Sequence, residues 1–175
     1  IAAWCALRGL RVTLQDRAQK YVEPALKRAR ELFAKRLHAP GEAEAATARL
    51  SVDLEAKEIG SADLVIEAII ENADAKRALF QGLEPKLPAA ALIATNTSSI
   101  KLEDLTAGLM RPERFLGLHF FNPVASLPLV EVIRSATTDE SALQAALSFV
   151  IRIGKLPLPC RSAPGFLVNR LLTPY

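Results

Sequence analysis

One histidine and one glutamate, in neighbouring apolar segments, are the strongest candidates for acid–base chemistry. His119 lies in the segment LGLHFFNPV (residues 116–124), and Glu131 lies in LVEVI (residues 129–133). An imidazole changes its charge near neutral pH, and a carboxylate beside it can orient the ring and stabilise the charged form. Such a pair can remove the proton of an alcohol while a hydride leaves, as a dehydrogenase requires. A lone histidine in an apolar run is more often a core residue, so the pair alone leaves both interpretations open.

Further polar residues follow the other predicted strands. In an open α/β sheet, ligands bind at the carboxyl ends of the strands. Four predicted strands end in such residues: Asp16, Glu71, Asn96 with Ser98, and the segment at 119–122. We therefore expect a ligand site along this edge of the sheet.

Asp16 follows a short predicted strand, where a dinucleotide-binding fold places the acid that hydrogen-bonds the adenosine ribose. That acid lies about 20 residues after a glycine-rich fingerprint, so we expect the fingerprint and the first strand to precede Ile1. An ordinary turn aspartate is an equally good interpretation of this position. An anionic Asp16 favours NAD over NADP, although the neighbouring Arg17 weakens this argument because an arginine can accommodate the additional phosphate.

The rest of the chain alternates predicted helices and strands. Apolar residues at every third or fourth position predict a long amphipathic helix over residues 20–37. Continuous apolar runs predict buried strands at 63–70 and 91–96, separated by a helix at 73–87. Thr137 and Glu140 have the spacing of a capping box before another helix, and a strand at 156–160 precedes a final helix. This order predicts an α/β fold with a Rossmann-like, doubly wound, mostly parallel sheet, truncated before its first strand and glycine-rich loop.

The composition excludes several classes of protein. Half of the 175 residues are hydrophobic and 23% are charged, with a net charge of +3. The basic residues are dispersed among acidic ones, which disfavours nucleic-acid binding. No apolar run of about 18 residues predicts a membrane span. Cys5 and Cys160 lack metal-ligand spacing, which predicts no metal site and favours two reduced thiols in a cytoplasmic enzyme.

Four motifs, in this order, resemble those of the L-3-hydroxyacyl-CoA dehydrogenase family. They are NTSS (96–99), HFFNP (119–123), LVEVI (129–133) and PGFLVNR (164–170). The resemblance covers essentially the whole chain, and LQD at 14–16 is most similar to the alpha subunits of multifunctional fatty-acid oxidation complexes. It implies an NAD-binding Rossmann-like domain over 1–163, and over 164–175 the beginning of a linker to a helical C-terminal domain that is mostly absent.

The resemblance also implies roles for the substrate-side residues. His119 would be the general base, and Glu131 would orient its ring. Ser98 and Asn169 would hydrogen-bond the reacting oxygen of the substrate. Asn122 is a secondary candidate for substrate binding, because Asn-Pro is also an ordinary turn sequence.

For the cofactor NAD, the resemblance implies that Asp16, with Gln15 beside it, binds the adenosine ribose. Glu71 and Lys76 would lie near the ribose and nicotinamide, and Asn96 near the nicotinamide ribose. The alternative for Glu71 and Lys76 is a solvated beginning of a helix.

The implied reaction is the NAD-dependent oxidation of L-3-hydroxyacyl-CoA to 3-ketoacyl-CoA in fatty-acid β-oxidation, within a homo-oligomer or a multienzyme complex. Activity is expected of the intact parent rather than of this chain alone. Two alternatives remain: a dehydrogenase of another hydroxy acid with the same catalytic pair, and a non-catalytic structural or binding protein. The joint presence of Ser98, His119, Glu131 and Asn169 disfavours the second.

Overall fold

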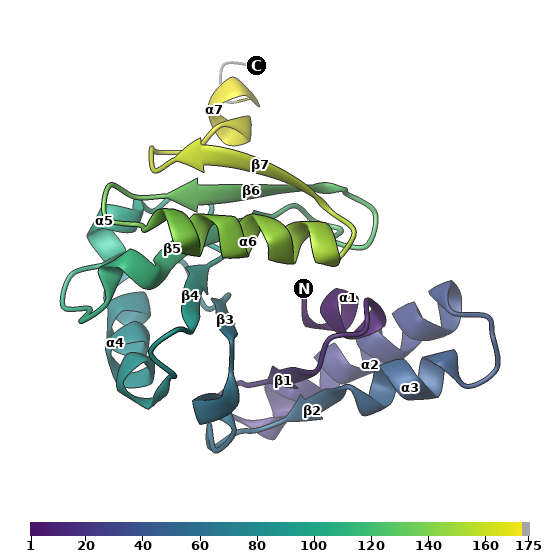
Figure 1. The fold of residues 1–175 in the computed structure, drawn as a ribbon. Coiled ribbons are helices and arrows are strands. Elements are labelled where there is room, and N and C mark those ends of the chain that lie inside the picture. Colours follow the sequence, from purple (N-terminus) through teal and green to yellow (C-terminus); the bar gives the residue numbers. More distant parts are fainter. Residues whose placement is uncertain (173–175) are drawn as a thin grey trace. The chain divides into compact units, whose positions relative to one another are not determined.

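The computed structural model describes residues 1–172, and its contacts divide the chain into two compact units, Ile1–Glu58 and Ile59–Tyr175 (Figure 1). Both units contain parallel strands and helices. The predicted fold class, an α/β protein with a mostly parallel sheet, is therefore confirmed. Within residues 1–172, no helix has the length and apolar character needed to cross a membrane.

The first unit packs three helices against a pair of parallel strands. Its elements are α1 (Ala2–Leu7), β1 (Val12–Leu14), α2 (Gln19–Arg36), α3 (Glu42–Ala48) and β2 (Leu50–Val52). The small side chains of Ala6, Ala29 and Ala46 surround Phe33 in its core. The predicted long helix is confirmed as α2, which buries Val22, Ala29 and Phe33 along one face.

The second unit is built on a five-stranded sheet in the order β3-β4-β5-β6-β7. All neighbouring strands are parallel except β5 and β6, which are antiparallel. The strands are β3 (Leu64–Glu67), β4 (Leu92–Thr95), β5 (Phe115–Phe120), β6 (Leu129–Arg134) and β7 (Leu156–Arg161). The helices are η1 (Ile59–Ser61), α4 (Ala73–Leu83), η2 (Glu84–Lys86), α5 (Leu102–Leu105), η3 (Pro112–Arg114), α6 (Glu140–Arg152) and α7 (Val168–Leu172).

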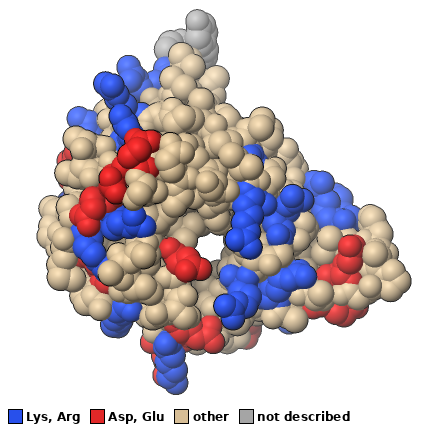
Figure 2. All heavy atoms as spheres, in the orientation of Figure 1, with Lys and Arg blue, Asp and Glu red and all other residues tan. Residues whose placement is uncertain are grey.

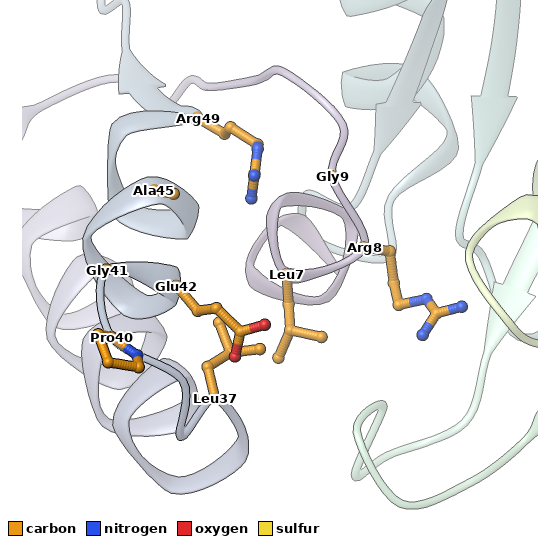
Figure 3. Close-up of a pocket in the computed structure, with 9 residues that line it drawn as sticks. All are labelled: Leu7, Arg8, Gly9, Leu37, Pro40, Gly41, Glu42, Ala45 and Arg49. Carbon is orange, nitrogen blue, oxygen red and sulfur yellow. The ribbon is translucent and has the colours of Figure 1, made fainter.

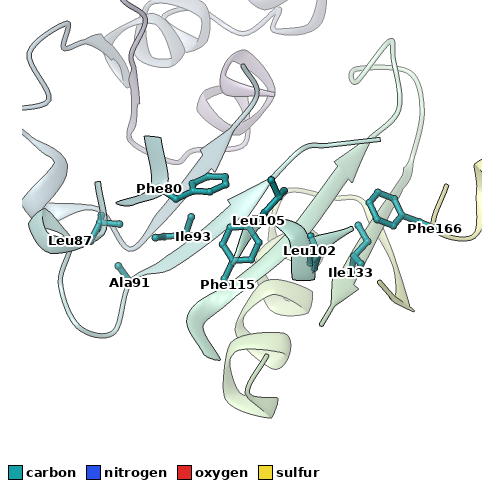
Figure 4. Close-up of a cluster of buried hydrophobic side chains, with 9 residues drawn as sticks. All are labelled: Phe80, Leu87, Ala91, Ile93, Leu102, Leu105, Phe115, Ile133 and Phe166. Carbon is teal, nitrogen blue, oxygen red and sulfur yellow. The ribbon is translucent and has the colours of Figure 1, made fainter. Parts of the chain in front are cut away.

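One face of this sheet carries a core cluster that reaches from α4 to the segment before α7 (Figure 4). Phe80 of α4 and Phe115 of β5 stack edge to face, with ring centroids 5.0 Å apart. Ile133 and Phe166 extend the same cluster. Because side chains alternate between faces along a strand, His119 lies on the face of Phe115, and Glu131 lies on the face of Ile133. Helix α6 packs against β5, β6 and β7, and it is drawn below β6 and β7 in Figure 1.

Gly117 of β5 leaves room for the side chain of Ile133 on the paired strand β6. It pairs with Ile133 across the two strands. A β-carbon at Gly117 would lie 2.9 Å from Cδ1 and 3.0 Å from Cβ of Ile133. The side chain of Ile133 therefore occupies the space that a larger residue at position 117 would need. Position 117 lies two residues before His119 in the same strand.

Three predicted element boundaries were wrong. The strand predicted at 63–70 ends at Glu67, whose Oε1 accepts the backbone N–H of Ile69 at 2.6 Å, and Ile70 is 71% exposed. This strand lies at the edge of its sheet, so Leu64, Val65 and Ile66 are only half-buried. The helix predicted at 73–87 ends at Leu83 and is followed by a 3₁₀ turn containing Pro85, which cannot donate a backbone hydrogen bond. The residue that precedes α6 is Asp139, and not Thr137 of the predicted capping box.

Candidate functional site

The antiparallel pairing of β5 and β6 places Glu131 directly opposite His119. Their side chains form a hydrogen bond of 2.7 Å between Nδ1 of His119 and Oε2 of Glu131. His119 is 7% exposed and Glu131 is fully buried. A carboxylate only accepts hydrogen bonds, so Nδ1 carries the proton and Nε2 keeps the lone pair that can accept one. This arrangement fixes the orientation of the ring and leaves Nε2 able to accept a proton.

The second oxygen of Glu131 binds the segment of the PGFLVNR motif. Oε1 accepts the backbone N–H groups of Leu167 at 2.9 Å and of Val168 at 2.8 Å. These amides lie at the beginning of α7, where backbone N–H groups have no partner within the helix. The rings of Phe121 and Phe166 lie 4.6 and 5.8 Å from the His119 ring. One buried carboxylate therefore connects the histidine to a segment distant in sequence.

Ser98 and Asn169 lie next to each other although they are far apart in the sequence. Ser98 is exposed and follows β4, and Asn169 lies in α7. The side-chain amide of Asn169 donates to the backbone carbonyl of Ser98 at 3.4 Å. The structure thus brings together the two residues predicted to hold the substrate oxygen.

Asn96 and Asn122 lie at the ends of β4 and β5. Oδ1 of Asn96 accepts the backbone N–H of Phe120 at 2.9 Å, which ties the ends of the two strands together. Asn122 is exposed and precedes a turn at 124–126.

Lys76 is buried in a network of two carboxylates. Its Nζ lies 2.6 Å from Oε1 of Glu67 and 3.4 Å from Oε2 of Glu71, and its side chain is 1% exposed. Glu67 also accepts the hydroxyl of Thr95 at 2.7 Å. The alternative of a solvated lysine at the beginning of a helix is therefore wrong for Lys76. Sequence reasoning missed Glu67, although an acidic residue inside an apolar run was an available signal.

Glu71 binds the loop that carries Ser98. Its Oε1 accepts the backbone N–H groups of Ser98 at 3.0 Å and Ser99 at 3.3 Å, and also the hydroxyl of Thr97. Burial raises the pKa of the Glu71 carboxyl, but the hydrogen bonds from Thr97 and Ser98 and the charge of Lys76 outweigh it. The net pKa lies below its ordinary value, so Glu71 is ionised at neutral pH.

Gln15 and Asp16 belong to the first unit and directly follow β1, and both side chains are exposed. Asp16 accepts the backbone N–H of Arg17 at 2.7 Å. The guanidinium of Arg17 stacks on Tyr21, 4.8 Å from the ring centroid. An exposed carboxylate directly after a parallel strand has the acceptors that two ribose hydroxyls need, so these residues fit the adenosine end of NAD.

Figure 2 shows both signs of charge on the face in view, which is mostly uncharged. Among residues 1–172, no cluster of His, Cys, Asp and Glu could hold a metal ion.

Burial raises the pKa of the Cys5 thiol to about 11, and burial together with the charge of Glu131 raises that of Cys160 to about 12. Both thiols are therefore protonated and unreactive at neutral pH.

A cavity of about 510 Å³ in the first unit contains none of the predicted site residues (Figure 3). Its charged lining residues are Arg8, Glu42 and Arg49, and its apolar ones include Leu7 and Leu37. Arg49 uses one guanidinium nitrogen to hold the carbonyl of Ala6 at 3.3 Å.

A mostly parallel α/β fold with polar side chains at the ends of its strands is typical of dinucleotide-binding domains. The chain belongs to the family described as 3-hydroxyacyl-CoA dehydrogenase, NAD binding domain, whose model matches residues 1–163. NAD is the cofactor of this family, as the resemblance implied.

Individual relatives agree with this assignment. The fatty acid oxidation complex subunit alpha of Pseudomonas paraeruginosa is 37% identical over the whole of this chain, which spans 25% of that relative. Among solved structures, 3-hydroxybutyryl-CoA dehydrogenase from Escherichia coli matches 99% of this chain and 38% of its own, with a TM-score of 0.95 and 34% identity. The (S)-3-hydroxybutyryl-CoA dehydrogenase from Ralstonia eutropha matches 99% of this chain and 62% of its own, with a TM-score of 0.93 and 33% identity. The chain thus spans about a quarter of the curated relative.

Proposed function

We propose that the intact parent protein oxidises L-3-hydroxyacyl-CoA to 3-ketoacyl-CoA with NAD, as a step of fatty-acid β-oxidation. The observation that supports this proposal is the buried hydrogen bond of 2.7 Å between His119 and Glu131. An alcohol releases hydride only as it loses its hydroxyl proton, so the reaction needs a base at that oxygen. Nε2 of His119 provides the base, and Glu131 stabilises the positive charge that the ring acquires.

Ser98 and Asn169 hold the substrate oxygen as it changes from alcohol to ketone. Both carry side-chain hydrogen-bond donors, and the bond from Asn169 to the carbonyl of Ser98 keeps the two residues adjacent. Fixing the oxygen against His119 turns proton transfer into a positioned, unimolecular step. Asn122, in the exposed turn after β5, is a further contact for the substrate.

NAD, when bound, accepts the hydride. We propose that Asp16 and Gln15 hold its adenosine ribose, and that Glu71, Lys76 and Asn96 belong to the cofactor site after β3 and β4. The exposed carboxylate of Asp16 has free lone pairs for ribose hydroxyls. For Lys76, burial against Glu67 supports an indirect contribution through the carboxylates that it holds.

We further propose the domain organisation and the assembly. Residues 1–163 form the NAD-binding domain, and residue 164 begins the linker to a helical domain that completes the acyl-CoA site. The named relative is a subunit of a fatty acid oxidation complex. We therefore propose that the parent protein is part of a homo-oligomer or a multienzyme complex in the cytoplasm.

His119→Ala in the full-length parent tests the base assignment. We expect turnover to fall by about 10²–10⁴-fold, a typical contribution of a general base, with nearly unchanged affinity for NAD. NADH formation is measured by absorbance with a four-carbon and a long-chain L-3-hydroxyacyl-CoA. His38→Ala is the matched control, because His38 is exposed and is the other histidine of the chain. Turnover like that of the wild type in His119→Ala would refute the assignment.

Asp16→Ala tests the cofactor assignment. Loss of the carboxylate removes the acceptor for the ribose hydroxyls, so we expect weaker NAD binding, measured by titration with fluorescence detection. Unchanged affinity would show that Asp16 does not contact the ribose. If the wild-type parent binds NAD but produces no NADH from either thioester, the substrate is another hydroxy acid.

A further inference from the structure

One oxygen of Glu71 gathers donors from three consecutive residues of the loop after β4. Oε1 accepts the backbone N–H groups of Ser98 and Ser99, at 3.0 and 3.3 Å, and the hydroxyl of Ser99 at 3.2 Å. It also accepts the hydroxyl of Thr97, whose own oxygen accepts the N–H of Ile100 at 3.1 Å. The backbone of Ser98 is therefore fixed mainly through this carboxylate.

The other oxygen of Glu71, Oε2, forms an ion pair with Lys76. The ammonium group lies 3.4 Å from Oε2 of Glu71 and is itself fixed by Glu67 at 2.6 Å and by the carbonyl of Ile69 at 3.5 Å. The side chains of Lys76 and Glu67 are 1% and 0% exposed. The buried ammonium group is therefore a fixed cation beside Oε2 of Glu71.

We propose that Glu71 is a positioning residue for Ser98 and that Lys76 holds Glu71 in place for this purpose. The inference rests on the proposed function, in which Ser98 contacts the substrate oxygen. Ser98 and Ser99 are exposed and have little apolar surface to anchor them. Without Glu71 the loop loses its central acceptor, and displacement of a catalytic contact by about 1 Å can cost on the order of 100-fold in rate.

A double-mutant cycle in the full-length parent separates positioning from cofactor binding. We expect Glu71→Ala to lower kcat at saturating NAD by about 10–100-fold, in addition to any increase in the KM for NAD from the loss of a cofactor contact. In the Ser98→Ala background the same change should lower kcat by less than about threefold, because no serine remains to be positioned. Independent, multiplying effects on kcat would overturn the proposal. So would a large increase in the KM for NAD with unchanged kcat, which would assign Glu71 to the cofactor alone.

Hydrogen exchange gives a second measurement that does not depend on activity. The amides of Ser98 and Ser99 both donate to Glu71, so Glu71→Ala should speed their exchange by about tenfold or more. Glu103→Ala is the matched control, because this nearby exposed glutamate accepts the hydroxyl of Ser162 at 2.6 Å. Unchanged exchange in Glu71→Ala overturns the inference. If exchange is faster in Glu71→Ala but the wild-type parent makes no NADH, the proposed reaction is overturned. The role of Glu71 in holding the loop is kept in that case.

The contribution of Lys76 is tested with both buried charges removed. Lys76→Met alone leaves Glu67 buried without its cation, which is expected to destabilise the fold. The double variant Glu67→Gln with Lys76→Met removes both buried charges and keeps side chains of similar volume. Thermal unfolding compares the stability of this double variant with that of Lys76→Met. We expect the folded double variant to show faster exchange at Ser98 and Ser99 than the wild type. Exchange like that of the wild type would show that Glu71 holds the loop without Lys76.

Discussion

Replacing Glu131 by glutamine changes one atom of the buried pair and should nearly abolish turnover. Glu131 is fully buried and accepts three hydrogen bonds, from Nδ1 of His119 at 2.7 Å and from the N–H groups of Leu167 and Val168 at 2.9 and 2.8 Å. Glutamine keeps one accepting oxygen and replaces the other with a donating NH₂ group. Its orientation therefore decides which partners lose their acceptor.

The hydrogen-bond count favours one orientation. If the NH₂ group faced the two backbone amides, both would be left unsatisfied, at about 1–3 kcal/mol each. If it faces His119, both amides keep their acceptor, and Nδ1 accepts a hydrogen bond from the NH₂ group. The ring then carries its own proton on Nε2, which can no longer act as a base. We expect kcat to fall by about 10²–10⁴-fold, with stability lowered by roughly 1–2 kcal/mol because charge-assisted hydrogen bonds become neutral ones.

NADH formation at saturating substrates measures the first effect, and denaturant unfolding of the full-length parent measures the second. Glu84→Gln is the matched control. Glu84 is 2% exposed and accepts the N–H groups of Met110 and Arg111 at 2.8 and 2.7 Å, one on each oxygen. It should lose a similar amount of stability and keep its turnover. A Glu131→Gln protein with kcat like that of the wild type would refute the tautomer argument.

Two further predictions concern packing and thiols. Gly117→Ala should lower the free energy of unfolding by about 1–3 kcal/mol, because its β-carbon would lie 2.9 Å from Cδ1 of Ile133. The control Gly82→Ala, with nothing within 4 Å of its β-carbon in α4, should stabilise by about 0.5–1 kcal/mol in the same denaturant titration, and equal effects of the two would contradict the packing argument. The raised pKa values of Cys5 and Cys160, about 11 and 12, should slow alkylation by iodoacetamide at pH 8 by at least about tenfold in the folded protein relative to the denatured one. Mass spectrometry measures both rates, and equal rates would refute the prediction.

The sequence predicted the elements better than their ends. Helix α2 follows its apolar periodicity, and the alternation of strands and helices predicted the α/β class. The strand predicted at 63–70 was too long, because apolar residues can be exposed once a side chain such as Glu67 binds the backbone and turns the chain. For Lys76 the sequence left a solvated beginning of a helix open as the alternative to cofactor binding, because charge alone does not tell whether a buried partner is present.

The sequence by itself determined which residues could do chemistry. The types and order of His119, Glu131, Ser98 and Asn169, within their motifs, led to the family that the comparisons established. These residues are identified by side-chain type and local context, both of which are properties of the linear chain.

Only the tertiary structure decided what each of these residues contacts. The antiparallel register of β5 and β6 placed Glu131 opposite His119, and the return of the chain to α7 gave Glu131 the amides of Leu167 and Val168. The same folding turned Glu71 toward the loop of Ser98 and enclosed Lys76 between two carboxylates. Strand register and the packing of segments distant in sequence depend on the whole set of competing contacts, because a shift of one residue reverses the face of every side chain in a strand. Strand register and long-range packing therefore cannot be predicted from a local stretch of sequence.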